Sequence, residues 1–239
     1  MAGALRNMAE PTAGVCPICW TFHDPAFAQC VSCVGASELD VVVPISYAPR
    51  GGQLALALRG YKDEYLYRTR YHHAMRLAAI LWRFLLEHER HVARASGVST
   101  FDVVAVVPSK TTENDEARPG LRTIVGTLIE HTAPRFERLL RPSDTGMVGR
   151  YFDPERYATS RRLDGESILL IDDTWVTGSS AQSAAAALRQ AGAGRVGFVV
   201  IGRWLTLSFG GEWGTVRDKY GHLPKQFDWS SCAAEFLPQ

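Results

Sequence analysis

The sequence lacks any uninterrupted apolar run approaching the ~20 residues that a helix needs to cross a bilayer, so we expect no membrane partner. Its first 14 residues also lack the apolar core of a signal peptide, which predicts a cytoplasmic protein. The chain also lacks an excess of charge of either sign, because its formal net charge is only +1. This argues against a protein that coats nucleic acid by bulk electrostatics. With 46% hydrophobic and 21% charged residues, the chain is not a largely disordered one.

Cysteine is scarce, and four of the five cysteines form two C-x-x-C pairs, Cys16 with Cys19 and Cys30 with Cys33. The fifth, Cys232, stands alone. An odd count without a signal peptide indicates a reducing compartment, where paired cysteines hold metal more often than they form disulfides. The spacing suits a tetrahedral structural zinc site with no open coordination position, and a redox pair or an iron–sulfur cluster are the alternatives.

Changes in composition divide the 239 residues into three parts. We expect a frayed leader (1–15) within an N-terminal zinc module that ends at residue 36. An α/β domain follows over 37–210, and the aromatic, irregular stretch 211–239 is an extension that the sequence does not place.

The middle part alternates apolar strands with helical patterns, which is typical of a parallel sheet covered on both faces. The predicted strands are 39–47, 101–108, 167–172 and 196–202, and the predicted helices are 54–60, 70–92, 121–131 and 179–192. Residues 132–166 are predicted to be loops with a short strand. No G-x-G-x-x-G follows an early strand, which argues against a generic dinucleotide-binding protein.

Acidic residues and a glycine turn follow the third predicted strand. Asp172 and Asp173 are expected just beyond the strand, next to solvent, and the turn T-G-S-S (177–180) leads into a helix. Free amides at a helix N-terminus bind phosphate, and Gly178 allows close approach of an anion. The two carboxylates would repel phosphate and therefore predict sugar hydroxyls or a divalent cation as partners. The alternative is a strand end with an ordinary N-capping serine.

The stretch ILLIDDTWVTGSS (168–180) resembles the phosphoribosyl-pyrophosphate signature of type I phosphoribosyltransferases. The resemblance implies a Rossmann-like fold, with a parallel sheet and flanking helices. It also implies that Asp172 and Asp173 are catalytic and bind the ribose hydroxyls, directly or through Mg²⁺. The residues implied to hold the 5′-phosphate are Thr174, Val176, Thr177, Gly178, Ser179 and Ser180.

A wider resemblance, over roughly 16–203, is to the competence protein F family. Its features appear here in order: four cysteines, the segment LALALRGYKD, a strand that ends in V-P, and the late signature. Members usually carry R-G-x-N-Q after the V-P strand, whereas this chain has ENDEARPGLRT (113–123), in which Arg118 is a partial match.

Such a fold also needs a loop for the leaving pyrophosphate, and VVPSKTT (106–112) is the best candidate. Ser109 and Lys110 would supply a hydroxyl, a backbone donor and a catalytic positive charge. The alternative is a surface turn with an exposed lysine. Arg59 and Lys62 are further candidates, although a solvated helix end explains them as well.

The sequence thus predicts a Mg²⁺-dependent enzyme that transfers a phosphoribosyl group from phosphoribosyl pyrophosphate to a nitrogen nucleophile. The alternative is a weak or inactive protein that binds a phosphoribosyl ligand or a nucleotide and serves DNA uptake or regulation. Between Arg118 and Arg162 there are nine basic and five acidic residues, so any contact with single-stranded or duplex DNA should be weak and salt-sensitive.

Overall fold

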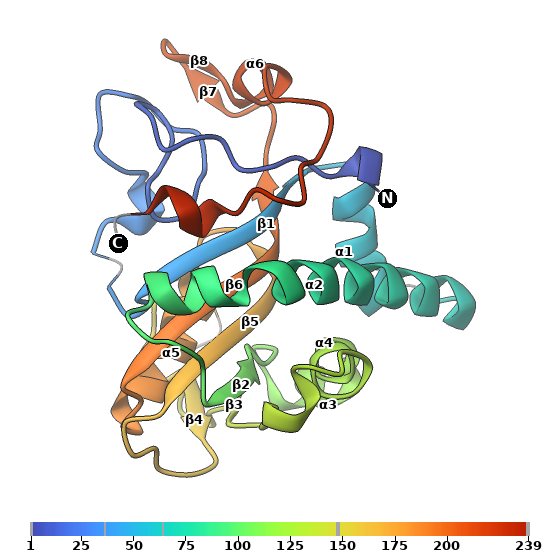
Figure 1. Ribbon diagram of the computed structural model, residues 1–239, viewed down its shortest axis with the longest axis vertical. Coiled ribbons are helices and arrows are strands. Elements are labelled where there is room, and N and C mark those ends of the chain that lie inside the picture. Colours follow the sequence, from blue (N-terminus) through green and yellow to red (C-terminus); the bar gives the residue numbers. More distant parts are fainter. Residues whose placement is uncertain (1, 36, 64, 147–148, 238–239) are drawn as a thin grey trace.

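The computed structural model describes residues 2–35, 37–63, 65–146 and 149–237. A four-stranded sheet lies at its centre, and all its neighbouring strands run parallel (Figure 1). In spatial order the strands are β1 (Val41–Pro49), β6 (Arg195–Leu205), β5 (Ser167–Trp175) and β2 (Val103–Val106). The predicted parallel α/β sheet is therefore confirmed.

Helices cover both faces of the sheet because its strands are apolar on both sides. On β5, Leu169 and Ile171 belong to the core under α1 (Gln53–Asp63) and α2 (Tyr67–Ala95). Ile168 and Leu170 face the other way, into the core shared with α5 (Ser179–Gln190). The alternation of side chains along the strand thus separates two cores.

Shorter elements surround the sheet. Between β2 and β5 lie α3 (Thr112–Ala117), α4 (Gly120–Thr123), a π-helical turn (Ile124–Leu128), a 3-10 turn (Ala133–Arg135) and the antiparallel pair β3 (Leu140–Pro142) and β4 (Tyr157–Thr159). After β6 come β7 (Gly210–Gly211), β8 (Gly214–Thr215), α6 (Val216–Gly221) and a 3-10 turn (Ala233–Phe236). Two further 3-10 turns lie at Ala2–Ala4 and Val31–Cys33.

The helix predicted over 121–131 extends too far, because residues 129–131 are not helical, and Ile124–Leu128 is a π-helical turn rather than an α-helix. The chain forms α4 and then the π-helical turn, which ends at Leu128. Thr132 stops further winding, because its hydroxyl donates to the carbonyls of Val125 (2.6 Å) and Ile129 (3.1 Å). A side chain that bonds nearby carbonyls in this way competes with regular helical pairing.

The prediction of a frayed leader is also wrong. Leu5 is fully buried, the Arg6 amide donates to Ser46 Oγ (2.8 Å), and the Tyr47 amide donates to the Arg6 carbonyl (3.2 Å). Farther along, the Tyr47 hydroxyl donates to the Trp20 carbonyl (2.7 Å). The N-terminal residues therefore pack along β1 and share its core.

The C-terminal stretch returns to the N-terminal residues and to α2 (Figure 1). The Asn7 amide group donates to the Asp228 carbonyl, and the Asp228 amide donates to Asn7 Oδ1, both at 2.8 Å. Segments near the start and near the end of the chain are thus joined at Asn7 and Asp228. Among the helices in the described parts of the chain, none is both long and apolar enough to cross a membrane.

Candidate functional site

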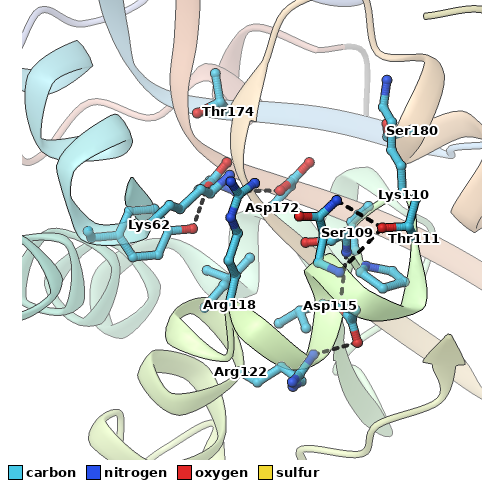
Figure 2. A pocket seen from close by; sticks show the side chains of 17 residues that line it. Lys62, Ser109, Lys110, Thr111, Asp115, Arg118, Arg122, Asp172, Thr174 and Ser180 are labelled. Carbon is cyan, nitrogen blue, oxygen red and sulfur yellow. Dashed lines mark hydrogen bonds and ion pairs between the residues drawn. The ribbon is translucent and has the colours of Figure 1, made fainter. Parts of the chain in front are cut away.

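A cavity of about 400 Å³ opens at the carboxyl ends of β2 and β5 (Figure 2). This edge of an open α/β sheet is where such folds bind their ligands. Its walls come from segments that are far apart in the sequence: Tyr61, Lys62, Val106, Val107, Pro108, Ser109, Lys110, Thr111, Asn114, Asp115, Arg118, Leu121, Arg122, Asp172, Asp173, Thr174 and Ser180.

Asp172 and Asp173 do not lie beyond the strand as predicted, because β5 continues to Trp175. Pairing with β6 extends it, since Asp172 lies opposite Val200 and Trp175 opposite Arg203. Successive side chains of a strand point to opposite faces, so the two carboxylates have different surroundings.

Asp173 is buried, with 2% of its surface exposed, and points toward the end of α1. It forms an ion pair with Lys62 and accepts a hydrogen bond from the Tyr61 hydroxyl. Burial, followed by the Asp173 charge, raises the pKa of Tyr61 well above its usual value. Burial alone would lower the pKa of Lys62, but the nearby carboxylates, led by Asp173, raise it overall. Asp173 is therefore already neutralised by the chain.

Asp172 is only half-buried, and it faces the cavity. Its Oδ1 accepts a hydrogen bond from the Asp173 amide at 2.8 Å. Burial and then the Asp173 charge raise the pKa of Asp172 to about 8, although Lys62 and the amide hydrogen bond act in the opposite direction. Asp172 is thus the carboxyl group of the pair that a ligand or cation could engage.

The loop after β2 is held by Asp115, a residue that the sequence analysis did not single out. Asp115 is 3% exposed, and its Oδ1 accepts a hydrogen bond from the Ser109 amide at 2.9 Å. Its Oδ2 pairs with Arg122 (2.5 Å) and Arg138 (2.9 Å). An acid within the charged stretch ENDEARPGLRT was the only sequence signal, and nothing there marked it as buried.

Lys110 turns across the cavity wall toward the β3–β4 region, where its ammonium donates to the Gly149 carbonyl. Burial lowers the pKa of Lys110, and the charges of Arg156 and Arg150 lower it further. Arg156 is itself 1% exposed, and its Nε and Nη1 have no hydrogen-bond partner among the described residues. A buried guanidinium with unpaired donors is a favourable place for an anion.

Positive groups outnumber the acids around the cavity. Its lining includes Lys62, Lys110, Arg118 and Arg122, against three aspartates, two of which already have basic partners. Arg118, the partial match to the family motif, pairs with Asp63 at 2.8 Å and is exposed. Ion pairs within the chain thus engage Lys62, Arg118 and Arg122, and Lys110 is the lining cation for which the described residues show no ion pair.

The residues expected to hold phosphate do not all line the same cavity. Thr174 and Ser180 line the 400 Å³ cavity with the aspartates, whereas Thr177, Gly178 and Ser179 line a neighbouring one of about 310 Å³ that also includes Arg150. Val176 is 46% exposed and lines a third.

Gly178 begins α5 in a left-handed conformation, with φ of 84°. A Cβ atom there would lie 2.1 Å from the Trp175 ring, so both the backbone angle and the packed indole require glycine. This close packing positions the N-terminus of α5, where the Ser179 amide donates to Thr177 Oγ1 at 3.4 Å.

The four N-terminal cysteines form a compact, buried cluster, as their spacing predicts. Their sulfur atoms all lie within 4.8 Å of one another, and Cys19 Sγ is 3.6 Å from Cys30 Sγ. Four sulfurs at the usual Zn–S length of ~2.3 Å from one ion would be about 3.8 Å apart. The cluster could therefore hold a structural metal such as zinc.

Arg203 joins the cysteine cluster to the end of β5. It is 4% exposed, and it donates to the Cys19 carbonyl (2.7 Å) and to Cys19 Sγ (3.4 Å). Its Nη1 also donates to the carbonyls of Trp175 (3.1 Å) and Val176 (3.2 Å). This buried arginine was missed by sequence reasoning, because it lies inside an apolar strand far from its partners.

Searches against protein-family models and against curated proteins give no match to this chain. The cavity combines one half-buried carboxyl, several cations and hydroxyl groups at the carboxyl edge of a parallel sheet.

Proposed function

We propose that this chain is a type I phosphoribosyltransferase-like protein of the competence protein F kind, with the Rossmann-like fold of that class. It binds phosphoribosyl pyrophosphate with Mg²⁺ in the 400 Å³ cavity and transfers the phosphoribosyl group to a nitrogen nucleophile. The observation that carries the proposal is the placement of Asp172 opposite several cations at the carboxyl ends of β2 and β5. Structural zinc in the four-cysteine cluster is part of the proposal.

The two aspartates have separate roles in this proposal. Asp172 accepts the ribose hydroxyls or contributes an oxygen to Mg²⁺, because it is the one that faces the cavity without a basic partner of its own. Asp173 is a positioning residue, which holds Lys62 and Tyr61 at the cavity wall. Mg²⁺, when bound, would neutralise phosphate charge and orient the ligand.

The basic residues of the cavity bind the pyrophosphate end of the ligand. Lys110 and the Ser109 hydroxyl would hold the leaving pyrophosphate, and Arg118 and Arg122 add positive charge nearby. In the reaction, the bond from the sugar carbon to the pyrophosphate oxygen breaks, that oxygen keeps the electron pair, and a bond to nitrogen forms. These residues stabilise the developing negative charge on the pyrophosphate, which is the largest catalytic contribution at many such sites.

A second candidate is binding without turnover, in a regulatory role or in DNA uptake. The observation that favours it is that other residues of the chain already contact two of the side chains expected to bind the ligand. Asp173 is paired with Lys62, and Lys110 donates to the Gly149 carbonyl. The departure from R-G-x-N-Q at 113–123 points the same way.

Calorimetry with phosphoribosyl pyrophosphate, with and without Mg²⁺, tests the binding site. Asp172→Asn should weaken Mg²⁺-dependent binding by about one to two orders of magnitude, since a charge-assisted hydrogen bond contributes roughly 1.5–3 kcal/mol. Asp164→Asn is the matched control, because Asp164 is an exposed aspartate on the loop that precedes β5. If wild type does not bind, or if both variants bind like wild type, the proposed site is wrong.

Pyrophosphate release then separates the two candidates. Wild-type protein is incubated with phosphoribosyl pyrophosphate, Mg²⁺ and a panel of nitrogen bases. Base-dependent release supports the transferase, whereas tight binding with no release across the panel supports the binding protein.

A further inference from the structure

A second group of metal-ligating side chains lies away from the cavity, where α2 meets the C-terminal stretch. His88 and His91 occupy one face of α2, three residues apart, and Cys232 precedes the last 3-10 turn. One ligand atom from each lies within 4.8 Å of the other two. His88 is 3% exposed and Cys232 is 1% exposed, so the group belongs to the interior.

A hydrogen bond at one nitrogen of the His88 ring leaves the other nitrogen able to bind a metal. His88 Nε2 lies 2.6 Å from the Trp229 carbonyl, which can only accept. Nε2 therefore carries the ring hydrogen, and Nδ1 presents its lone pair to the cluster. Metal-bound histidines typically make this kind of bond through the nitrogen that does not bind the ion.

The distances between ligand atoms match a small tetrahedral site. His88 Nδ1 and His91 Nδ1 are 3.4 Å apart. Two nitrogens at the usual Zn–N length of ~2.0–2.1 Å would be separated by about 3.4 Å in a tetrahedron. Without a metal, the two neutral imidazoles can form a hydrogen bond at this distance only if His91 Nδ1 carries a hydrogen.

Glu235 lies beside these three residues but outside the group whose ligand atoms all lie within 4.8 Å of one another, so its side chain would have to rotate to bring an oxygen to the site. Its Oε1 lies 3.0 Å from His91 Nδ1, and its Oε2 accepts a hydrogen bond from the Cys232 amide at 3.1 Å. The carboxylate is therefore held beside the cysteine that it would join. Its side chain is 42% exposed, which leaves the cluster a route to solvent.

We propose that His88, His91 and Cys232, joined by Glu235 after a rotation of its side chain, form a second zinc site, which fastens the C-terminal stretch to α2. A set of two imidazoles, one thiolate and one carboxylate suits zinc, whereas Mg²⁺ and Ca²⁺ prefer oxygen ligands alone. All four positions are supplied by the chain, so the ion is structural. Binding displaces the thiol hydrogen of Cys232 to solvent.

Zinc binding changes one contact at the rim. Arg90 Nε donates to His91 Nε2 at 3.2 Å, which places the ring hydrogen of His91 on Nδ1, toward Glu235. A metal at Nδ1 moves that hydrogen to Nε2 and breaks the contact with Arg90. Arg90 is exposed and can turn into water, so the rearrangement is small.

Zinc content of the full chain, measured by elemental analysis after dialysis against a weak chelator, tests the proposal. Wild type should hold two zinc ions per chain, one in each cluster. Cys232→Ser and His91→Gln should each hold one, and His222→Ala should hold two, because His222 is an exposed histidine outside both clusters. One zinc in wild type, or two in both cluster variants, would overturn the proposal in favour of a metal-free hydrogen-bonded group.

A titration of metal-free wild type with Co²⁺ avoids any dependence on how the variants fold. Two equivalents should bind, one with the intense charge-transfer absorption of four thiolates and one with the weaker absorption of a single thiolate. Saturation at one equivalent, with only the four-thiolate spectrum, would overturn the proposal.

Discussion

The cysteine cluster and the cavity at β5 differ in how the chain assembles them. The cluster takes all four ligand atoms from one short N-terminal segment and buries them together. The cavity takes its walls from α1, the loop after β2, the 113–123 segment and β5, and leaves charged groups facing open space. The first is complete within the chain, whereas the second is open, and the proposed function assigns it a ligand from outside.

This difference predicts opposite consequences of mutation. A side chain that completes a closed, buried group should affect the stability of the fold, because its partners are left unsatisfied when it is lost. A side chain that faces an open cavity should affect ligand binding and can even stabilise the empty protein when it is removed. Three substitutions test the contrast.

Cys16→Ser should have the largest effect. Cys16 is fully buried, and the cysteines share a core with the β-strands, so we expect the whole chain to lose more than about 4 kcal/mol of unfolding free energy and to release zinc. Urea denaturation followed by tryptophan fluorescence measures this. Ser32→Ala is the control, because Ser32 is an exposed residue between Cys30 and Cys33. A Cys16→Ser midpoint equal to that of the control would show that the cluster does not stabilise the fold.

Lys62→Met should have an intermediate effect, because Lys62 belongs to both sides of the comparison. It lines the cavity, yet it also neutralises the buried Asp173. Removing one partner of a buried pair costs roughly 3–5 kcal/mol, and partial exposure of Lys62 and the remaining bond from Tyr61 should reduce this to about 2 kcal/mol.

Arg59→Met on the same helix removes an exposed cation and serves as the control for Lys62→Met. Thermal unfolding at neutral pH compares the two variants with wild type. Equal stabilities would mean that Asp173 does not depend on Lys62 for its charge balance.

Asp172→Asn should be the one substitution of the three that stabilises the empty protein, by an amount that depends on pH. The pKa of Asp172 rises from 3.8 to about 8 on folding, so between these values the folded chain keeps a proton that the unfolded chain releases. Raising the pH therefore favours unfolding, by at most about 1.4 kcal/mol for each pH unit.

Asparagine cannot ionise, so the Asp172→Asn variant should be stabilised relative to wild type as the pH rises from 4 to 8, with little difference near pH 4. Melting temperatures of both proteins across this range measure the effect. Parallel curves would show that Asp172 titrates normally.

The sequence predicted the local features well and the long-range ones poorly. C-x-x-C spacing identified the cysteine cluster, and apolar runs identified the four strands of the sheet. By contrast, β5 was predicted to end at Asp172, because aspartate is unfavourable in strands. Pairing of Thr174 with Gly202 in β6 extends it, and no short window of sequence contains that information.

Buried charges and distant pairs were missed for the same reason. Asp115 and Arg203 look like ordinary polar residues in the sequence, and their burial depends on partners from other elements. His88 and His91 also showed no recognisable metal spacing, since the cysteine beside them comes from the other end of the chain. Contacts between remote segments decide all of these cases.

The strand order also has a consequence for how the chain is completed during synthesis. Within the described sheet, the edge strand β1 pairs with β6, so the strand pairing of residues 41–49 has to follow the synthesis of residues 195–205. At about 5–20 residues per second, ribosomes need on the order of ten seconds to make the intervening chain. The first cysteines are made earlier still, and Arg203 arrives with β6. During this interval the N-terminal thiols have neither their sheet nor their arginine, and early capture of metal would protect them from oxidation.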